Sequence, residues 1–119
     1  MPRISITRAA LREVRQRLAA FPIANCVRIT GPSEAIGPSE ASWWLETDLE
    51  DVRLLEKLYG KPPRWRLELS PRGAGKAPTR DVYREEIEGI GFEIFTSKPV
   101  PSLHVELYRE ALRVHEVDA

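Results

Sequence analysis

The residue types that could do chemistry are concentrated in a basic, glycine-containing segment, Ser70–Arg80. Gly73 and Gly75 allow its backbone to approach a ligand closely. Lysine and arginine recur at short intervals within the segment and immediately before it, and such a cluster is suited to binding phosphate. The predicted anion-binding or nucleic-acid-binding residues are Arg64, Arg66, Arg72, Lys76 and Arg80.

This segment is not a P-loop, the motif that holds nucleotide phosphates. The P-loop requires a glycine five residues before Gly75 and a serine or threonine directly after Lys76. The chain has Ser70 and Ala77 at these two positions. What remains is a basic loop beside Trp65, the combination of cations and an aromatic ring that binds RNA or single-stranded DNA. Nucleic-acid binding is therefore an alternative hypothesis for the function.

The sequence offers no complete set of residues for nucleophilic catalysis. Cys26 is the only cysteine, and a cysteine nucleophile needs a base and a third group that orients the base. The two histidines, His104 and His115, lie far from it along the chain and in no recognised motif. Free cysteines are among the most buried residue types, so we predict a core thiol at Cys26 and no catalytic residue. A small enzyme is accordingly the last of our hypotheses.

The sequence likewise predicts no metal ligand and no cofactor. Ser102 is a reasonable N-cap for a helix over residues 103–115, on which His104 and His115 share a face but lie about 16 Å apart, too far to bind one ion. The same segment alternates at its start, so a strand over its first half is an alternative to the helix. The acidic residues Glu85, Glu86 and Glu88 have no converging partner in the sequence, so we expect a solvated helix face.

The pair Trp43 and Trp44 is the predicted partner-binding site. Neighbouring residues on a strand point to opposite faces, so one of the two indoles would face away from the core. Tryptophan is enriched at the energetic centres of protein interfaces. The alternative is that another element of the same chain covers the outward ring.

Composition indicates a soluble, cytoplasmic protein without an internal disulfide. The chain has one cysteine, no apolar run of about 18 residues or more and no signal-type segment after Met1. Asn25 and Gln16 are the only side-chain amides, and there are ten prolines. Few thermolabile residues and many prolines predict thermostability, although a GC-rich genome would produce a similar composition.

The formal net charge is zero, but charge is segregated along the chain. Residues 1–30 contain six basic and one acidic residue, and residues 31–60 contain two basic and seven acidic residues. Residues 61–84 contain seven basic and two acidic residues, and residues 85–119 contain three basic and eight acidic residues. Adjacent blocks could neutralise each other at the surface. The alternative is a two-faced molecule that favours an anionic ligand or self-association as a homodimer.

The central elements that must position these residues are predicted as strand 42–47, helix 48–59 and strand 64–69. Asp48 can cap the helix, whose apolar residues recur at helical spacing, and Gly60 can end it. Trp65, Leu67 and Leu69 then alternate with polar residues, as on a strand with one buried face.

The flanking pattern predicts strands at 3–6, 25–30 and 91–96, and helices at 8–20, 80–88 and 103–115. Thr7 would cap the first helix. The predicted fold is a single α+β domain over residues 1–119. It has a mixed four- to five-stranded sheet with three or four helices mainly on one face, as in ferredoxin-like sandwiches. For this domain we predict a non-catalytic binding or accessory protein that acts through protein–protein contacts or self-association, with no membrane partner.

Overall fold

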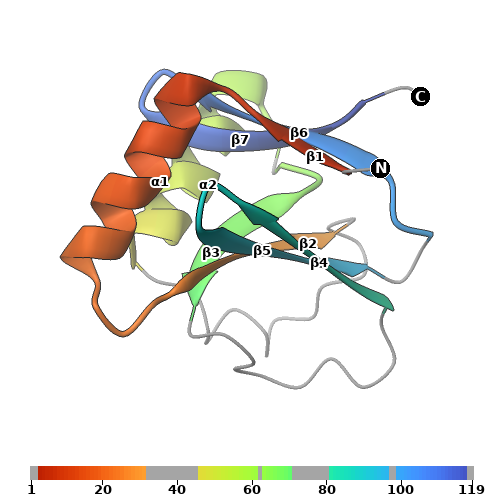
Figure 1. The fold of residues 1–119 in the computed structure, drawn as a ribbon. Coiled ribbons are helices and arrows are strands. Elements are labelled where there is room, and N and C mark those ends of the chain that lie inside the picture. Colours follow the sequence, from red (N-terminus) through yellow and green to blue (C-terminus); the bar gives the residue numbers. More distant parts are fainter. Residues whose placement is uncertain (1–2, 32–45, 62, 71–80, 97–98, 118–119) are drawn as a thin grey trace.

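The structure is a computed structural model that describes residues 3–31, 46–61, 63–70, 81–96 and 99–117 (Figure 1). Within this part of the chain there are seven strands and two helices. They are β1 (Ile4–Ile6), α1 (Arg8–Ala20), β2 (Cys26–Gly31), α2 (Glu46–Tyr59), β3 (Arg66–Ser70), β4 (Asp81–Ile87), β5 (Ile90–Thr96), β6 (Ser102–Tyr108) and β7 (Ala111–Val117). Neither helix is long and apolar enough to cross a membrane.

The strands form two sheets that face each other (Figure 1). The small sheet has the order β1-β6-β7, with β1 parallel and β7 antiparallel to β6. The large sheet has the order β3-β2-β5-β4, in which β2 and β5 are parallel and the outer pairs are antiparallel. Helix α1 runs beside both sheets in Figure 1.

A single apolar core lies between the sheets and α1. It forms because apolar residues alternate with polar ones along the strands and so gather on one face of each sheet. The helix adds apolar side chains at intervals of three and four residues. Its main members are Ala10, Leu11, Val14, Val27, Ile29, Leu67, Leu69, Phe92, Ile94, Leu103, Val105, Leu112 and Val114.

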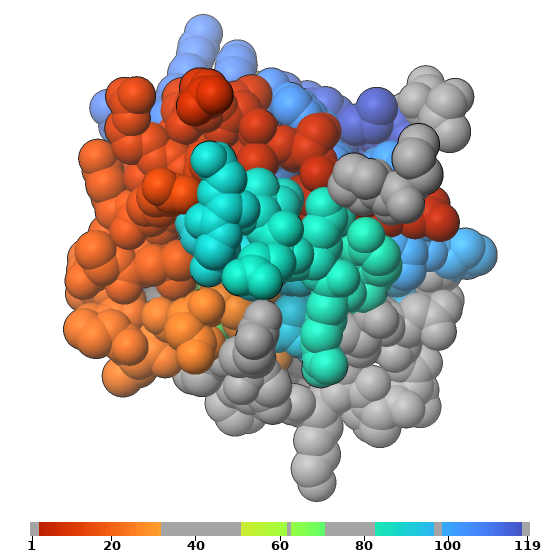
Figure 2. Space-filling view, in the orientation of Figure 1, coloured from red at the N-terminus to blue at the C-terminus, as the bar shows by residue number. Residues whose placement is uncertain are grey.

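The two sheets also approach each other at their edges. Glu85 on β4 accepts hydrogen bonds from the backbone N–H groups of Arg3 (3.1 Å) and Ile4 (3.2 Å) on the N-terminal side of the small sheet. The space-filling view shows β4 and its turn packed below the N-terminal strand and helix (Figure 2). At the opposite side of the molecule, β3 lies beside β7.

Several predicted elements are confirmed. Thr7 Oγ1 accepts a hydrogen bond from Ala10 N (3.2 Å) and caps α1. The strands predicted at 3–6, 25–30, 64–69 and 91–96 are β1, β2, β3 and β5, with small shifts of their ends. Helix α2 begins two residues earlier than predicted, at Glu46, so the end of the predicted strand 42–47 is helical. Residues 42–45 lie outside the described part of the chain.

The predicted ferredoxin-like fold, one mixed sheet with three or four helices on one face, is wrong. The described residues contain two sheets of three and four strands and two helices. Residues 80–88, predicted as a helix, contain strand β4, and the predicted helix 103–115 is the β6–β7 hairpin.

Both segments instead contain a two-residue hairpin turn with positive φ at both positions. Glu88 and Gly89 have φ values of 47° and 83°, and Arg109 and Glu110 have values of 48° and 74°. Such turns match the twist of the two strands that they join, and they usually contain asparagine or glycine. Because Arg109 and Glu110 are neither, the second turn has no recognisable signal in the sequence.

Candidate anion-binding pocket

Most of the site residues predicted from the sequence fall outside the described part of the chain. These are Trp43, Trp44, Arg72, Lys76 and Arg80. Arg64 is described and exposed, and it lines a pocket. Arg66 is half-buried on β3, where burial lowers its pKa and the charge of Glu68 opposes that shift. The structure therefore places Arg64 and Arg66 in different surroundings.

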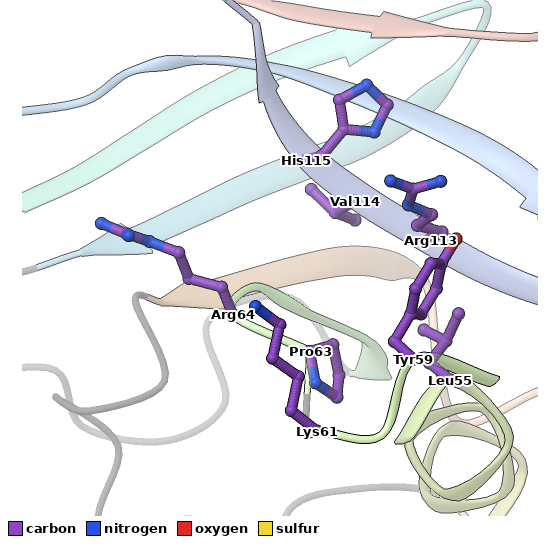
Figure 3. A pocket seen from close by; sticks show the side chains of 8 residues that line it. All are labelled: Leu55, Tyr59, Lys61, Pro63, Arg64, Arg113, Val114 and His115. Carbon is purple, nitrogen blue, oxygen red and sulfur yellow. The ribbon is translucent and has the colours of Figure 1, made fainter. Parts of the chain in front are cut away.

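The pocket that contains Arg64 has a volume of about 190 Å³ and lies between the end of α2 and strand β7 (Figure 3). Its residues come from three stretches: Leu55 and Tyr59 of α2, Lys61, Pro63 and Arg64 of the connection to β3, and Arg113, Val114 and His115 of β7. Leu55 and Val114 are buried and belong to its apolar side. Apart from Tyr59, all the ionisable residues among these eight are basic: Lys61, Arg64, Arg113 and His115.

The end of α2 positions the connecting segment. Gly60 N donates a hydrogen bond to Glu56 O (2.7 Å), and Gly60 has φ of 76°, the left-handed conformation that ends a helix. The chain then turns so that Lys61, Pro63 and Arg64 line the pocket beside β7, with the Arg64 side chain extending away from Arg113 (Figure 3). Arg64 Nε lies 3.3 Å from Glu116 Oε2 on β7, which ties the segment to the strand.

Ion pairs around the pocket leave it with an excess of positive charge. Arg113 Nη1 lies 3.1 Å from Glu106 Oε1, and Arg64 pairs with Glu116. Neither carboxylate lines the pocket. Lys61, Arg64 and Arg113 together therefore exceed the two nearby carboxylates by one charge. Ion pairs that are this exposed contribute only about 0–1 kcal/mol, so an incoming anion can replace a carboxylate at little cost.

Two tyrosines hold Arg113 in place. The rings of Tyr59 and Tyr108 stack with centroids 5.8 Å apart. Arg113 Cζ lies 5.0 Å from the centroid of Tyr59 and 5.8 Å from that of Tyr108. Tyr59 is nevertheless 43% exposed, although it is a large aromatic residue. Tyrosine and arginine in such clusters are typical of the residues that dominate binding energy at protein interfaces.

The thiol of Cys26 is not placed as a nucleophile. Cys26 is fully buried, and its Sγ donates a hydrogen bond to Glu93 Oε1 at 3.2 Å. Burial, followed by the hydrogen bond to Glu93, raises the pKa of the thiol to about 11, although Ser70 and Arg28 oppose the shift. A thiol with this pKa is protonated at neutral pH and is a poor nucleophile. The predicted core thiol is confirmed.

The acidic residues 85, 86 and 88 lie on β4 and its turn, not on a helix. Glu85 Oε1 accepts hydrogen bonds from the backbone N–H groups of Arg3 and Ile4 and from the hydroxyl of Tyr83 (3.1 Å). In the part of the chain that the structure describes, no three histidine, cysteine or acidic side chains converge as a metal-binding group.

Sequence reasoning missed most of the pocket. Lys61 and Tyr59 carry no signal in the sequence, because their role depends on the strand they face. On the helix predicted over 103–115, Arg113 and His115 would not line one wall of a pocket with Arg64. Comparison of the chain with protein-family models, with curated proteins and with solved structures found no match.

Proposed function

We propose that the protein is a non-catalytic binding protein that holds an acidic side chain of a protein partner in the basic pocket. The observation that carries the proposal is that Lys61, Arg64, Arg113 and His115, from two separate stretches of the chain, line one small cavity. The apolar side of the pocket complements the methylene groups of a glutamate, and the basic side complements its carboxylate.

The size of the pocket favours a side chain over a larger ligand. Sites for drug-sized molecules and cofactors have volumes of about 300–1,000 Å³. At about 190 Å³ this pocket is smaller. The exposed Tyr59 and the stacked Arg113 next to it would contact the surface around the bound side chain, as hot-spot residues do.

The nucleic-acid alternative has less support within the described residues. It relied on Trp65 as an aromatic partner for the basic loop, but Trp65 is 3% exposed and packs in the core. A buried indole cannot stack on a base. The other residues of that hypothesis, Arg72, Lys76 and Arg80, lie outside the described part of the chain.

The test is an NMR titration with a short glutamate-containing peptide and a matched glutamine-containing peptide. We expect the glutamate peptide to shift the signals of Lys61, Arg64 and Arg113. Arg113→Gln or Arg64→Gln should weaken binding about tenfold or more, since a hydrogen bond to a charged group contributes about 1.5–3 kcal/mol.

Arg109→Gln is the matched control for these variants. Arg109 is exposed and lies over Tyr108 (5.6 Å), but it does not line the pocket, so its loss should leave the affinity unchanged. Equal binding of the two peptides, or equal losses in all three variants, would refute the proposal. Salt-sensitive retention of a single-stranded oligonucleotide without peptide binding would favour the nucleic-acid alternative.

A second copy of the chain is itself a candidate partner, because the segregated charge predicts a homodimer. Among residues 85–119, exposed acidic side chains such as Glu86, Glu88 and Glu110 could enter the basic pocket of another protomer. Sedimentation equilibrium should show a dimer at low ionic strength that dissociates as salt screens the charges. A monomer under all salt conditions would leave only a different protein as the partner.

A further inference from the structure

The β6–β7 hairpin places the two histidines of the chain directly opposite each other. His104 pairs with His115 in the antiparallel register, so both side chains emerge from the same face of the small sheet. Their ring centroids are 5.4 Å apart, and the rings meet edge to face at 64°. Ser5 on β1 is the register partner of His104, which extends the row across all three strands.

The separation of the rings fits a shared metal ion. Two imidazoles that bind one tetrahedral Zn²⁺ through nitrogens about 2.0–2.1 Å from the ion have ring centroids about 5 Å apart. The observed centroid separation of 5.4 Å is close to this value. His115 has 39% of its side chain exposed, so an ion can reach the pair from solvent.

Each of the two rings has a polar side chain near its Nδ1 atom. His104 Nδ1 lies 2.7 Å from Ser5 Oγ, and Ser5 Oγ donates to Leu103 O (3.5 Å). In the tautomer with the proton on His104 Nδ1, Ser5 Oγ accepts that N–H and donates to the carbonyl, and the lone pair is left on Nε2.

The second ring has a carboxylate as its neighbour. His115 Nδ1 is shielded from solvent and lies 3.9 Å from Glu106 Oε1. A carboxylate beside Nδ1 favours the tautomer with the proton on that atom, an arrangement common around metal-bound histidines. Glu106 Oε1 also accepts a hydrogen bond from Arg113 (3.1 Å).

We propose that His104 and His115 bind a divalent transition-metal ion, such as Zn²⁺ or Ni²⁺, through their Nε2 atoms. Imidazole suits these ions, whereas Mg²⁺ and Ca²⁺ prefer oxygen ligands. Since no three ligand side chains converge among the described residues, water completes the coordination and the ion is exchangeable. This site does not depend on the proposed binding of acidic side chains, although His115 borders both.

The test measures binding of Zn²⁺ by calorimetry and the histidine ring ¹⁵N signals by NMR. In the unmodified protein we expect one ion per chain and a change at the Nε2 signals of both histidines. His104→Asn and His115→Asn should each weaken binding at least tenfold. Ser5→Ala should weaken it about tenfold, since outer-shell partners typically contribute 10–100-fold.

Three controls separate binding at the histidine pair from binding elsewhere on the protein. Mg²⁺ should not bind, and Cys26→Ser should bind Zn²⁺ as the unmodified protein does, because the buried thiol is not a ligand. His104→Asn should retain binding of the glutamate peptide, and Arg64→Gln should retain binding of Zn²⁺. No saturable binding at millimolar Zn²⁺, or unchanged binding in the His104→Asn/His115→Asn double variant, would overturn the inference.

Discussion

The thiol of Cys26 stabilises the fold in its protonated form. Because its folded-state pKa of about 11 lies above the ordinary value of 9.0, the unfolded chain loses this proton first as pH rises. The stabilisation is thus complete below about pH 9 and is lost between about pH 9 and pH 11, by about 2–3 kcal/mol.

This loss can be measured by urea unfolding across that pH range. We expect the free energy of unfolding of the unmodified protein to fall more steeply than that of Cys26→Ser, whose hydroxyl does not titrate. The raised pKa of Tyr83 affects both proteins and cancels in the comparison. If the free energies of unfolding of the two proteins fall in parallel with pH, the thiol of Cys26 is not the source of the loss.

Glu93 is a buried carboxylate of the large sheet, with 2% exposure. Burial acts to raise its pKa, but hydrogen bonds from Cys26 and Arg84 and the charges of Arg84 and Arg28 outweigh this and lower the pKa below 4.5. A lowered folded-state pKa stabilises the fold above about pH 4.5, and this contribution is lost as pH falls through the folded-state value.

We expect Glu93→Gln to reduce the free energy of unfolding by about 3 kcal/mol at pH 7, because it removes a carboxylate whose charge balances that of the buried Arg28. Arg84→Gln is the control. The side chain of Arg84 is 65% exposed, so its loss should cost about 1 kcal/mol or less. If the two substitutions reduce the free energy of unfolding equally, the burial of Glu93 does not determine how much its carboxylate stabilises the fold.

At the scale of the elements, one row of alternating charge crosses the whole large sheet. Glu68, Arg28, Glu93 and Arg84 occupy the same register position on β3, β2, β5 and β4. Arg28 Nη1 lies 3.7 Å from Glu68 Oε1, and Arg84 Nε lies 3.0 Å from Glu93 Oε2. A one-residue slip of any strand would break this row, so it favours the observed register.

The joint between β2 and β3 depends on a close approach at Gly31. A Cβ atom at this position would lie 2.6 Å from Trp65 Cε3 and 3.0 Å from the carbonyl oxygen of Arg64. We therefore expect Gly31→Ala to destabilise the protein by about 1–3 kcal/mol through overpacking.

Thermal or urea unfolding would measure this cost, and Trp65→Phe in the same chain should relieve part of it. The double variant should consequently be more stable than the sum of the two single effects predicts. Additive effects on the free energy of unfolding would mean that the ring of Trp65 is not what makes a larger residue at position 31 unfavourable.

At the scale of the whole molecule, the composition predicts thermostability. The chain has single asparagine, glutamine and methionine residues and ten prolines. We expect a thermal midpoint above about 65 °C, the upper end of the range typical of mesophilic domains. Differential scanning calorimetry measures this midpoint directly. A reversible transition near about 50 °C, within the mesophilic range, would mean that the composition reflects codon usage and not thermostability.

The sequence by itself determined the elements whose signals are local. Thr7 followed by an apolar helical pattern specified α1, and the buried strands β2 and β5 followed from short apolar runs. The burial of Cys26 also followed from its residue type. The segment 103–115 was ambiguous, because Leu103, Val105 and Leu107 alternate while Leu107, Ala111 and Val114 recur at helical spacing.

Only the tertiary structure decided that this segment is a hairpin, since pairing with β1 and burial against α1 outweigh local propensity. That decision also positions the residues of both candidate sites. On a helix, His104 and His115 would be about 16 Å apart; on paired strands their rings are 5.4 Å apart. Arg113 and Arg64 line one pocket for the same reason, because contacts between residues distant in sequence are set by strand pairing and not by the spacing of residues along the chain.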